Sequence, residues 1–432
     1  MQRLHRLKSF LFCLLVSGSI HAAEGEDEGH PLAGIPLRSI GPALTSGRIA
    51  DFAFHPDRWQ HFYVAVASGN VWKTENNGIT WKPIFENEGS YATGVVELDP
   101  SNPSTIWLGT GENNSQRSVG FGDGVYKSVD GGKSWNNMGL QDSGHISMIR
   151  IHPEDSDVVW VAAQGPLWNS GGDRGLYLTR DGGSSWSRIL DIDEDTGVNE
   201  FVMHPDDPDV IVASSYQRRR HVWTLINGGP GSGIHKTTDG GQSWTKVSKG
   251  LPKGEQGRIG LAMAPSSPNV IYAIIEADEE EQGIYRSTDF GESWEKRSDH
   301  MTSSPQYYNE LYVDPNDPDV VYSVDTFTHR SDDGGETWSR IGFKNRHVDD
   351  HALWIDPANS DHLYIGGDGG IYETWDKGET WRHVSNLPIT QFYRATPDND
   401  FPFYNVCAGT QDNFTLCGPS RTRYTDGITN AD

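Results

Sequence analysis

The chain has 432 residues, with 60 acidic and 35 basic side chains, and a formal net charge of −25. An acidic surface repels phosphate backbones, so nucleic acid is excluded as an expected partner. Only three cysteines are present, which excludes zinc binding by a set of cysteine ligands.

The first 22 residues have the pattern of an export signal. Arg3, Arg6 and Lys8 precede a mostly apolar run over residues 10–20, and small residues follow at 22 and 23. The apolar run is too short to cross a bilayer, and no later segment is apolar enough to do so. We therefore expect a cleaved signal peptide (1–22), an N-terminal lead-in (23–47) and a periplasmic or secreted protein without a membrane span.

An eight-residue motif, Ser/Thr-x-Asp-x-Gly-x-Ser/Thr-Trp, then occurs seven times, at spacings of 43 to 58 residues. Only the first copy departs from it, with Asn76 in place of Asp. The copies begin at Thr74, Ser128, Thr179, Thr237, Ser287, Ser331 and Thr374, and they end at Trp81, Trp135, Trp186, Trp244, Trp294, Trp338 and Trp381.

Short β-type runs surround every copy of this motif. An alternating run that ends in Pro precedes each copy, as in 52–56, and further runs enter and leave the motif. Four short antiparallel strands in tandem units of this length are typical of propeller blades, which cover each other's faces by radial packing. The sequence predicts an all-β fold: a seven-bladed β-propeller over residues 48–390, with one Asp-box hairpin per blade.

The repeated motif itself has a mechanical interpretation. Its Gly suits a tight hairpin turn that needs positive φ, its Asp can accept hydrogen bonds from turn amides, and its Trp can pack between sheets. A role that recurs seven times in one chain is structural rather than catalytic.

An eighth unit begins at residue 391, with β-type runs over 391–396 and 403–410 and no Asp-box. We expect two further strands to be missing and residues 391–432 to open a truncated second propeller; an unusual closing strand is the alternative. Cys407 and Cys417 lie in this unit, where a disulfide and two free thiols are equally compatible with the sequence.

The boxes and their surroundings resemble bacterial exported BNR/Asp-box proteins, also described as YVTN-like or sortilin-like repeat proteins. Stretches that carry this resemblance include residues 46–49, 122–128, 216–221, 257–260 and 351–357. A more distant similarity is to xyloglucanase-type two-propeller glycosidases. The resemblance implies the fold; it does not imply an activity, because function is grafted onto this scaffold at individual sites.

Propeller ligands commonly bind at one end of the central channel, on loops that enter the innermost strands or join the second strand to the third. Here these loops carry arginines, whose guanidinium groups suit carboxylate or phosphate recognition. The alternative is that the arginines form ion pairs with acids of the same loops. The candidate ligand-binding residues are Arg48, Glu112, Arg117, Arg218, Arg219, Arg220, His221, Arg258, Tyr307, Tyr308, Glu310, Asp349 and His351.

Catalytic and metal sites are less well supported. The 347–351 stretch contains His347, Asp349, Asp350 and His351, but neighbouring strand residues point to opposite faces, so we expect no metal site. The resemblance to xyloglucanases implies a catalytic Asp just before the third strand of the first blade, where residues 67–72 contain no acid. A sialidase-like pair of Tyr307 or Tyr308 with Glu310 is the remaining catalytic arrangement.

We therefore expect a binding propeller for a peptide, protein or glycan, without a cofactor and with an undetermined oligomeric state. The alternative is a glycoside hydrolase whose catalytic site is completed by a second propeller.

Overall fold

A computed structural model describes residues 40–41, 46–116, 119–424 and 427–429, all within one unit, Ile40–Asp432. The expected signal peptide and most of the lead-in lie outside these residues. Every regular element in the described ranges is a β-strand. The described part of the chain contains no helix that is long and apolar enough to cross a membrane.

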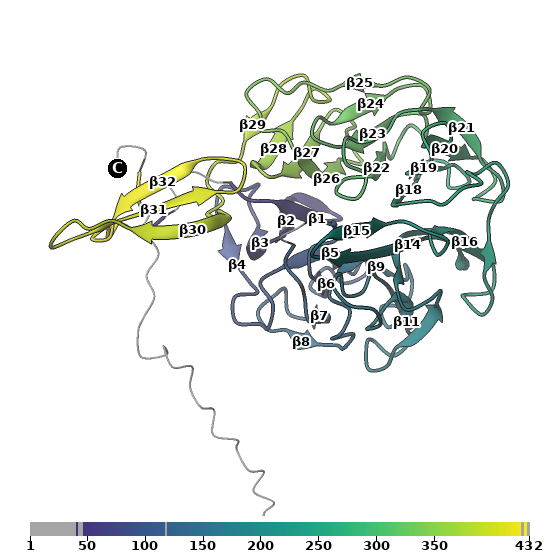
Figure 1. The fold of residues 1–432 in the computed structure, drawn as a ribbon, viewed down its shortest axis with the longest axis horizontal. Coiled ribbons are helices and arrows are strands. Elements are labelled where there is room, and N and C mark those ends of the chain that lie inside the picture. The colour runs from purple at the N-terminus through teal and green to yellow at the C-terminus, as the bar shows by residue number, and fades with distance from the viewer. Residues whose placement is uncertain (1–39, 42–45, 117–118, 425–426, 430–432) are drawn as a thin grey trace, which may run out of the picture. The chain divides into compact units, whose positions relative to one another are not determined.

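Seven sheets form the body of the described chain, and each runs in sequence order from an innermost to an outermost strand (Figure 1). The first four sheets contain β1 (Ile49–His55), β2 (Arg58–Val66), β3 (Asn70–Thr74) and β4 (Lys82–Pro83); β5 (Thr93–Leu98), β6 (Ile106–Thr110), β7 (Val125–Ser128) and β8 (Asn136–Asn137); β9 (Ile146–Ile151), β10 (Val159–Ala163), β11 (Gly175–Thr179) and β12 (Ser187–Leu190); and β13 (Thr196–His204), β14 (Asp207–His221), β16 (Gly233–Thr237) and β17 (Thr245–Lys246), with β15 (Thr224–Asn227) paired to β14.

The remaining three sheets of the ring have the same order. They contain β18 (Ile259–Met263), β19 (Ile271–Ile275), β20 (Gly283–Ser287) and β21 (Glu295–Ser298); β22 (Glu310–Val313), β23 (Val321–Val324), β24 (His329–Ser331) and β25 (Ser339–Arg340); and β26 (Asp350–Ile355), β27 (Leu363–Gly367), β28 (Gly370–Thr374) and β29 (Arg382–His383). The predicted all-β fold with seven four-stranded Asp-box blades is confirmed.

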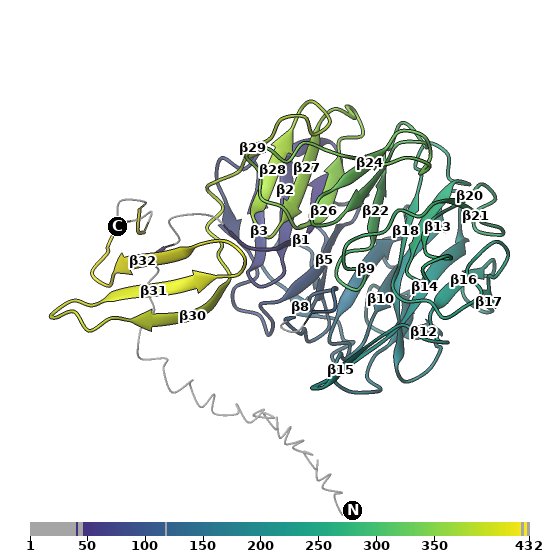
Figure 2. The same cartoon turned by 45° about the horizontal axis from the view of Figure 1, so that its top comes forward.

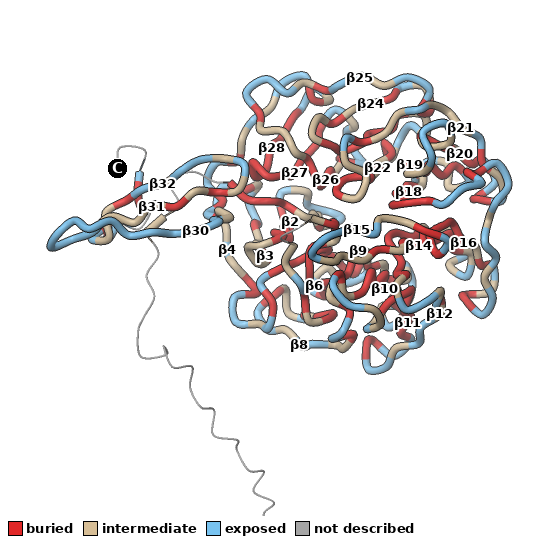
Figure 3. The backbone as a smooth tube through the Cα atoms, in the orientation of Figure 1, coloured by how far each residue is buried: buried red, intermediate tan, exposed pale blue. Residues whose placement is uncertain are grey.

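Apolar packing between neighbouring sheets holds the ring together. Each of the seven core clusters joins two adjacent sheets; one of them, for example, packs Val64 of the first sheet against Ile371 of the seventh. The ring therefore closes by direct contact between its first and last sheets. Gly47 also forms a parallel bridge with Gly369 beside this junction. Figure 3 shows the buried residues concentrated in the strands near the centre.

The Asp-boxes are turns in which hydrogen bonds satisfy the Asp carboxylate locally. In the second box, Asp130 accepts hydrogen bonds from the backbone N–H and the hydroxyl of Ser134, at 3.0 and 2.6 Å, and Gly132 has a φ of +83°. The ring N–H of Trp135 donates to the carbonyl of Ile84 in the preceding sheet. The mechanical interpretation of the motif is thus confirmed.

The last sheet differs from the predicted half-unit. It has three strands rather than two, β30 (Phe392–Pro397), β31 (Asn405–Thr410) and β32 (Thr415–Pro419) (Figure 2). The third strand was missed because it is short and holds a Cys and a Gly among few apolar residues. Cys407 and Cys417 face each other across β31 and β32 and form a disulfide, which decides between the two alternatives left open by the sequence.

Candidate functional site at the axial channel

The two ends of the channel differ in which connections surround them. We call one the box face: it carries the Asp-box turns and the turns between first and second strands, which are hydrogen-bonded to each other, as from Gly182 N to Asp157 O. The other is the loop face: it carries the connections into each innermost strand and those between second and third strands. The twelve candidate ligand-binding residues that the structure describes belong to the loop face or to the strand ends beside it.

The connection between β6 and β7 crosses the loop face and covers the channel. Ser115 N donates to Gln306 O of the connection into the sixth sheet, and the Asn113 side-chain amide donates to Glu310. In the same connection, Asn114 O accepts a hydrogen bond from Arg218 of the fourth sheet. At the channel mouth, the predicted ligand face is therefore crossed by the protein's own backbone. Arg117 lies outside the described residues.

Arg48 is the centre of a buried ion-pair network beneath this connection. Its Nε and Nη2 donate to the two oxygens of Asp368, at 2.7 and 3.0 Å, and its Nη1 donates to Glu112 Oε2 at 3.0 Å. The guanidinium also lies 4.9 Å from the ring centre of Tyr307. Burial disfavours ionisation of Asp368, but the charge of Arg48 outweighs it and holds the pKa of Asp368 below its usual range.

The network links three sheets that are distant in sequence, because Arg48 enters the first, Glu112 leaves the second and Asp368 follows a strand of the seventh. His351 lies beside it, with Nε2 at 3.5 Å from Asp368, and its ring stacks against Tyr308. Asp368 was not among the predicted site residues. It follows the two glycines that end β27, and no motif in the sequence marks it.

Glu310 forms the second ion pair, but its tyrosine partner is not the predicted one. Arg258 Nη2 donates to Glu310 Oε1 at 2.9 Å, and Tyr312 OH lies 3.4 Å from Glu310 Oε2. Tyr308 instead donates to Asp349, and Tyr307 packs under Arg48. The expected pairing of Glu310 with Tyr307 or Tyr308 is not formed. Tyr308 precedes β22, and Asn309 has a φ of +54°, so the strand alternation that places Tyr312 beside Glu310 does not extend back to Tyr308.

Arg218 is buried without an acidic partner. Its side chain is fully buried, Nη1 donates to Asn114 O at 3.4 Å, and Nε and Nη2 have no hydrogen-bond partner. Burial, and then the neighbouring guanidinium groups, lower the pKa of Arg218 to about 9. The adjacent His145 has its pKa lowered well below the usual value, by burial and then by Arg218.

Arg219 and His221 do not join Arg218 at the channel. The segment was predicted as a loop, yet residues 218–221 continue β14 and pair with β15, with Arg218 opposite Asn227. Alternate side chains of a strand point apart, so Arg219 reaches Asp195, which directly precedes β13 of the same sheet, while His221 stacks on Trp223 at the hairpin tip.

The residues of the 347–351 stretch also have separate partners. Asp349 accepts from Tyr308, Asp350 pairs with Arg346, His351 approaches Asp368, and His347 contacts the carbonyl of residue 412. Among the described residues, no three His, Cys, Asp or Glu side chains are grouped so that they could hold a metal ion.

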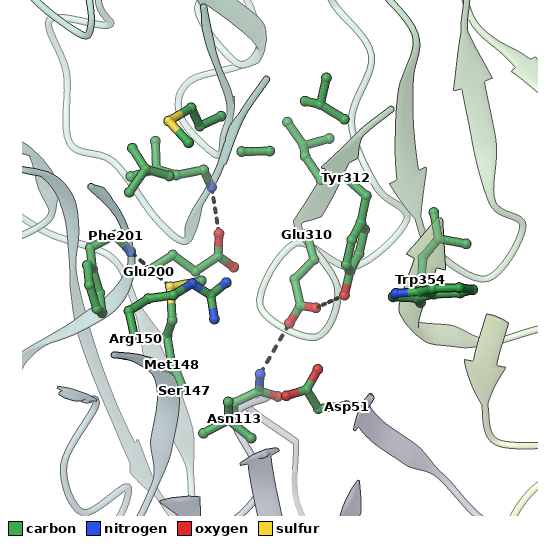
Figure 4. A pocket seen from close by; sticks show the side chains of 18 of the residues that line it. Asp51, Asn113, Ser147, Met148, Arg150, Glu200, Phe201, Glu310, Tyr312 and Trp354 are labelled. Atoms are coloured by element: carbon green, nitrogen blue, oxygen red, sulfur yellow. Dashed lines mark hydrogen bonds between the residues drawn. The ribbon is translucent and has the colours of Figure 1, made fainter. Parts of the chain in front are cut away.

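An axial cavity of about 460 Å³ lies beneath the covering connection. Its walls come from the innermost strands, and its polar side chains include Asp51, Glu200, Glu310 and Tyr312, with Arg150 beside them (Figure 4). Four of these, Asp51, Arg150, Glu200 and Tyr312, were not among the candidate ligand-binding residues. They occur in the innermost strands β1, β9, β13 and β22, where the channel-facing positions carry polar residues.

The carboxyl groups of this cavity satisfy backbone donors on the adjacent sheet. Asp51 accepts from Val96 N at 2.9 Å, and Glu200 accepts from Leu261 N at 2.6 Å. Burial raises the pKa of Asp51 to about 7. Burial, and then repulsion by Glu310, raise the pKa of Glu200 to about 8, and burial also raises the pKa of Glu310. Tyr312 is no activated nucleophile, because burial and the nearby carboxylates raise its pKa well above 10.

Exposed aromatic residues gather on the loop face. Tyr91 is 65% exposed, Phe121 80%, Trp168 48% and Trp223 81%. They form two neighbouring pairs, since Ser90 donates a hydrogen bond to the carbonyl of Phe121, and Arg220 N donates to Leu167 O beside Trp168. Exposed aromatic groups on adjacent loops are a common mark of a binding surface.

Comparison with known proteins supports the repeat assignment. The family model described as "Sortilin, neurotensin receptor 3" matches residues 123–244, and the BNR/Asp-box repeat model matches residues 329–340. Both agree with the resemblance inferred from the boxes. Each covers only part of the chain.

Among curated proteins, the chain is 25% identical over 243 residues to a xyloglucanase of Acetivibrio thermocellus. It is 22% identical over 228 residues to an oligoxyloglucan-reducing end-specific xyloglucanase of Emericella nidulans. The first match covers 49% of this chain and 26% of the enzyme, the second 48% and 25%. The matched region is thus about a quarter of each relative's length.

Solved structures show the same architecture. The GH74 xyloglucanase from Xanthomonas campestris superposes with a TM-score of 0.62 at 16% identity, over 86% of this chain and 59% of the enzyme. A GH74 enzyme from Niastella koreensis superposes with a TM-score of 0.60 at 16% identity, over 90% of this chain and 61% of the enzyme. At these identities the likeness concerns the fold alone.

Proposed function

We propose that this chain is an exported glycan-binding propeller whose ligand lies along the loop face over the second to fourth sheets. The observation that carries the proposal is the group of exposed rings at Tyr91, Phe121, Trp168 and Trp223. The flat apolar faces of aromatic rings suit stacking against the C–H faces of sugar rings, while polar edges remain in water. Similarity to enzymes named for xyloglucan makes a plant-type β-glucan the first ligand to test.

The covered channel favours binding at this surface over catalysis at the channel mouth. Glycoside hydrolysis needs two positioned carboxyl groups, one of them protonated and reachable by the glycosidic oxygen. Glu112 and Asp368 are both paired with Arg48 and nearly inaccessible, and Glu310 is paired with Arg258. At the position where the xyloglucanase resemblance implies an acid, Ser68 donates to Glu112 instead.

Affinity electrophoresis in gels containing xyloglucan tests this proposal. Replacing Trp168 or Trp223 by Ala should each weaken binding by about 1–2 kcal/mol, as is typical of exposed aromatic contacts at a binding centre. Trp375→Ala is the matched control, because Trp375 is 52% exposed and lies in an Asp-box on the opposite face. Equal retardation of the parent and of the Trp168→Ala, Trp223→Ala double variant would refute the proposal.

A glycoside hydrolase is the second candidate, favoured by the names of the curated relatives. In this alternative a second propeller, which residues 391–432 open, completes the catalytic site. The exposed three-stranded sheet β30–β32 supports that arrangement, since its first strand is exposed at all six positions. Release of reducing ends from xyloglucan by this chain, abolished in Glu310→Gln, would favour hydrolysis within the chain and contradict a purely binding role.

A further inference from the structure

The axial cavity is distinct from the loop-face surface and has two chemically different ends. One end lies under the β6–β7 connection, where Asn113 donates to Glu310 next to Asp51 (Figure 4). The other end reaches the box face, where Pro265 is exposed and the wall is formed by Met203, Met263 and Val313. The cavity is therefore acidic where it is closed and apolar toward its outer end.

The acidic end has more carboxyl groups than cations. Arg150 pairs with Glu97 at 3.1 Å, and Arg258 pairs with Glu310 at 2.9 Å. Asp51 and Glu200 accept backbone hydrogen bonds, but neither forms an ion pair with a lysine or arginine of the described chain. A carboxylate accepts more than one hydrogen bond, so both groups retain acceptor capacity toward the cavity.

Size and lining indicate an organic cation with an aliphatic body. A volume of about 460 Å³ is within the range of small-molecule sites, roughly 300–1,000 Å³. The rings of Tyr312 and Trp354 also line the wall, and aromatic faces attract cations.

We propose that this cavity binds a primary alkylammonium group on a short aliphatic chain. The ammonium group lies at the closed end between Asp51 and Glu200, where its three N–H donors meet the free carboxylate acceptors. The aliphatic chain lies against Met148, Met203 and Met263, whose flexible side chains adapt to its shape. Both carboxyl groups must be ionised to receive the cation, so binding releases protons near neutral pH.

Calorimetric titration with 1,5-diaminopentane tests the site, with pentane-1,5-diol as the uncharged control. At pH 7.5 we expect binding of the diamine, no binding of the diol, and a buffer-dependent heat that reports proton release. At pH 5.5 the affinity should fall at least tenfold as the carboxyl groups protonate. Nα-acetyl-lysine methylamide separates the two sources of the ammonium group. If it binds, the ligand is a lysine side chain of a peptide. If the diamine binds and this compound does not, the ligand is a free amine.

Glu200→Gln and Asp51→Asn should each weaken binding of the diamine at least tenfold. The amide oxygen of either variant can still accept the backbone hydrogen bond, but the negative charge is removed. Glu154→Gln, an exposed acid on the box face, is the control for net charge and should bind like the parent. Three results would overturn the proposal: equal binding of the diol and the diamine, unchanged affinity for the diamine in both cavity variants, or binding of CaCl₂ with the same affinity as the diamine. The diol and pH comparisons use the unmodified protein, so they remain decisive if a variant fails to fold, and neither depends on the glycan surface.

Discussion

Replacing Arg48 by Met should be among the most damaging single changes in the chain. Arg48 donates three charge-assisted hydrogen bonds, at 2.7, 3.0 and 3.0 Å, to two carboxylates that are at most 4% exposed. The substitution leaves Asp368 and Glu112 buried without their cation. Removal of one partner from a buried ion pair costs about 3–5 kcal/mol, and we expect a loss within that range.

The assay is urea-induced unfolding followed by tryptophan fluorescence, at pH 7.5 and at pH 4.5. Loss of Arg48 removes the charge that lowers the pKa of Asp368, so in the variant this carboxyl group takes up a proton at a higher pH. The destabilisation should therefore be largest at pH 7.5 and smaller at pH 4.5. Arg188→Met is the matched control, because Arg188 pairs with Asp191 at a site where both side chains are substantially exposed. Exposed pairs of this kind contribute about 0–1 kcal/mol.

Two results would refute this reasoning. An effect of Arg48→Met no larger than that of Arg188→Met would mean that burial does not strengthen the network. An equally large effect at both pH values would mean that the loss arises from packing of the Arg48 side chain against Tyr307 rather than from unpaired charge.

Three further predictions concern the cavity, the boxes and the last sheet. The raised pKa values of Asp51 and Glu200 mean that the folded state binds protons more tightly than the unfolded state. Their contribution to stability is therefore fully present below about pH 4 and is lost as the pH rises through 7 to 8. The melting temperature should fall between pH 5 and pH 8 for this reason, and Glu200→Gln should reduce the fall; an unchanged fall in the variant would contradict the assignment. Asp130→Ala should destabilise the protein by about 1–2 kcal/mol in chemical denaturation, because the turn donors lose their acceptor. Asp130→Asn should cost less, since Asn76 fills this position in the first box, where its side-chain oxygen accepts from Thr80 N. Equal losses of stability in the two variants would show that the charge is required. Reduction of the Cys407–Cys417 disulfide should accelerate amide hydrogen exchange over residues 405–419, because it removes a link that contributes about 2–4 kcal/mol. Equal acceleration in β1–β29 would show instead that the bond stabilises the whole chain.

The fold could be predicted from the sequence because its determinants are local. The Asp-box needs only eight residues to form its turn, and strand alternation is visible within five or six. Repetition of the same unit then leaves radial packing as the way to cover both faces of each small sheet. The third strand of the last sheet was missed because Thr415–Pro419 has neither strong alternation nor a motif.

The candidate site could be predicted only in part. Arg48, Glu112, Tyr307 and His351 do meet around one buried carboxylate, and Arg258 does pair with Glu310, as loops on one face of a propeller allow. The central carboxylate, Asp368, was not identified, since it is 320 residues from Arg48 and only ring closure brings the two together. Arg219 and His221 were misplaced because an extension of β14 sends alternate side chains to opposite sides.

By itself, the sequence determined the class of fold, the number of boxes and the structural role of each box, because hydrogen bonding within a turn depends on neighbours along the chain. Tertiary structure decided which groups share a cavity and which charges remain unpaired. The positions of Asp51, Glu200 and Glu310 at the axis depend on how seven sheets pack into a ring, and the balance between burial and ion pairing that sets their pKa values exists only after that ring has closed.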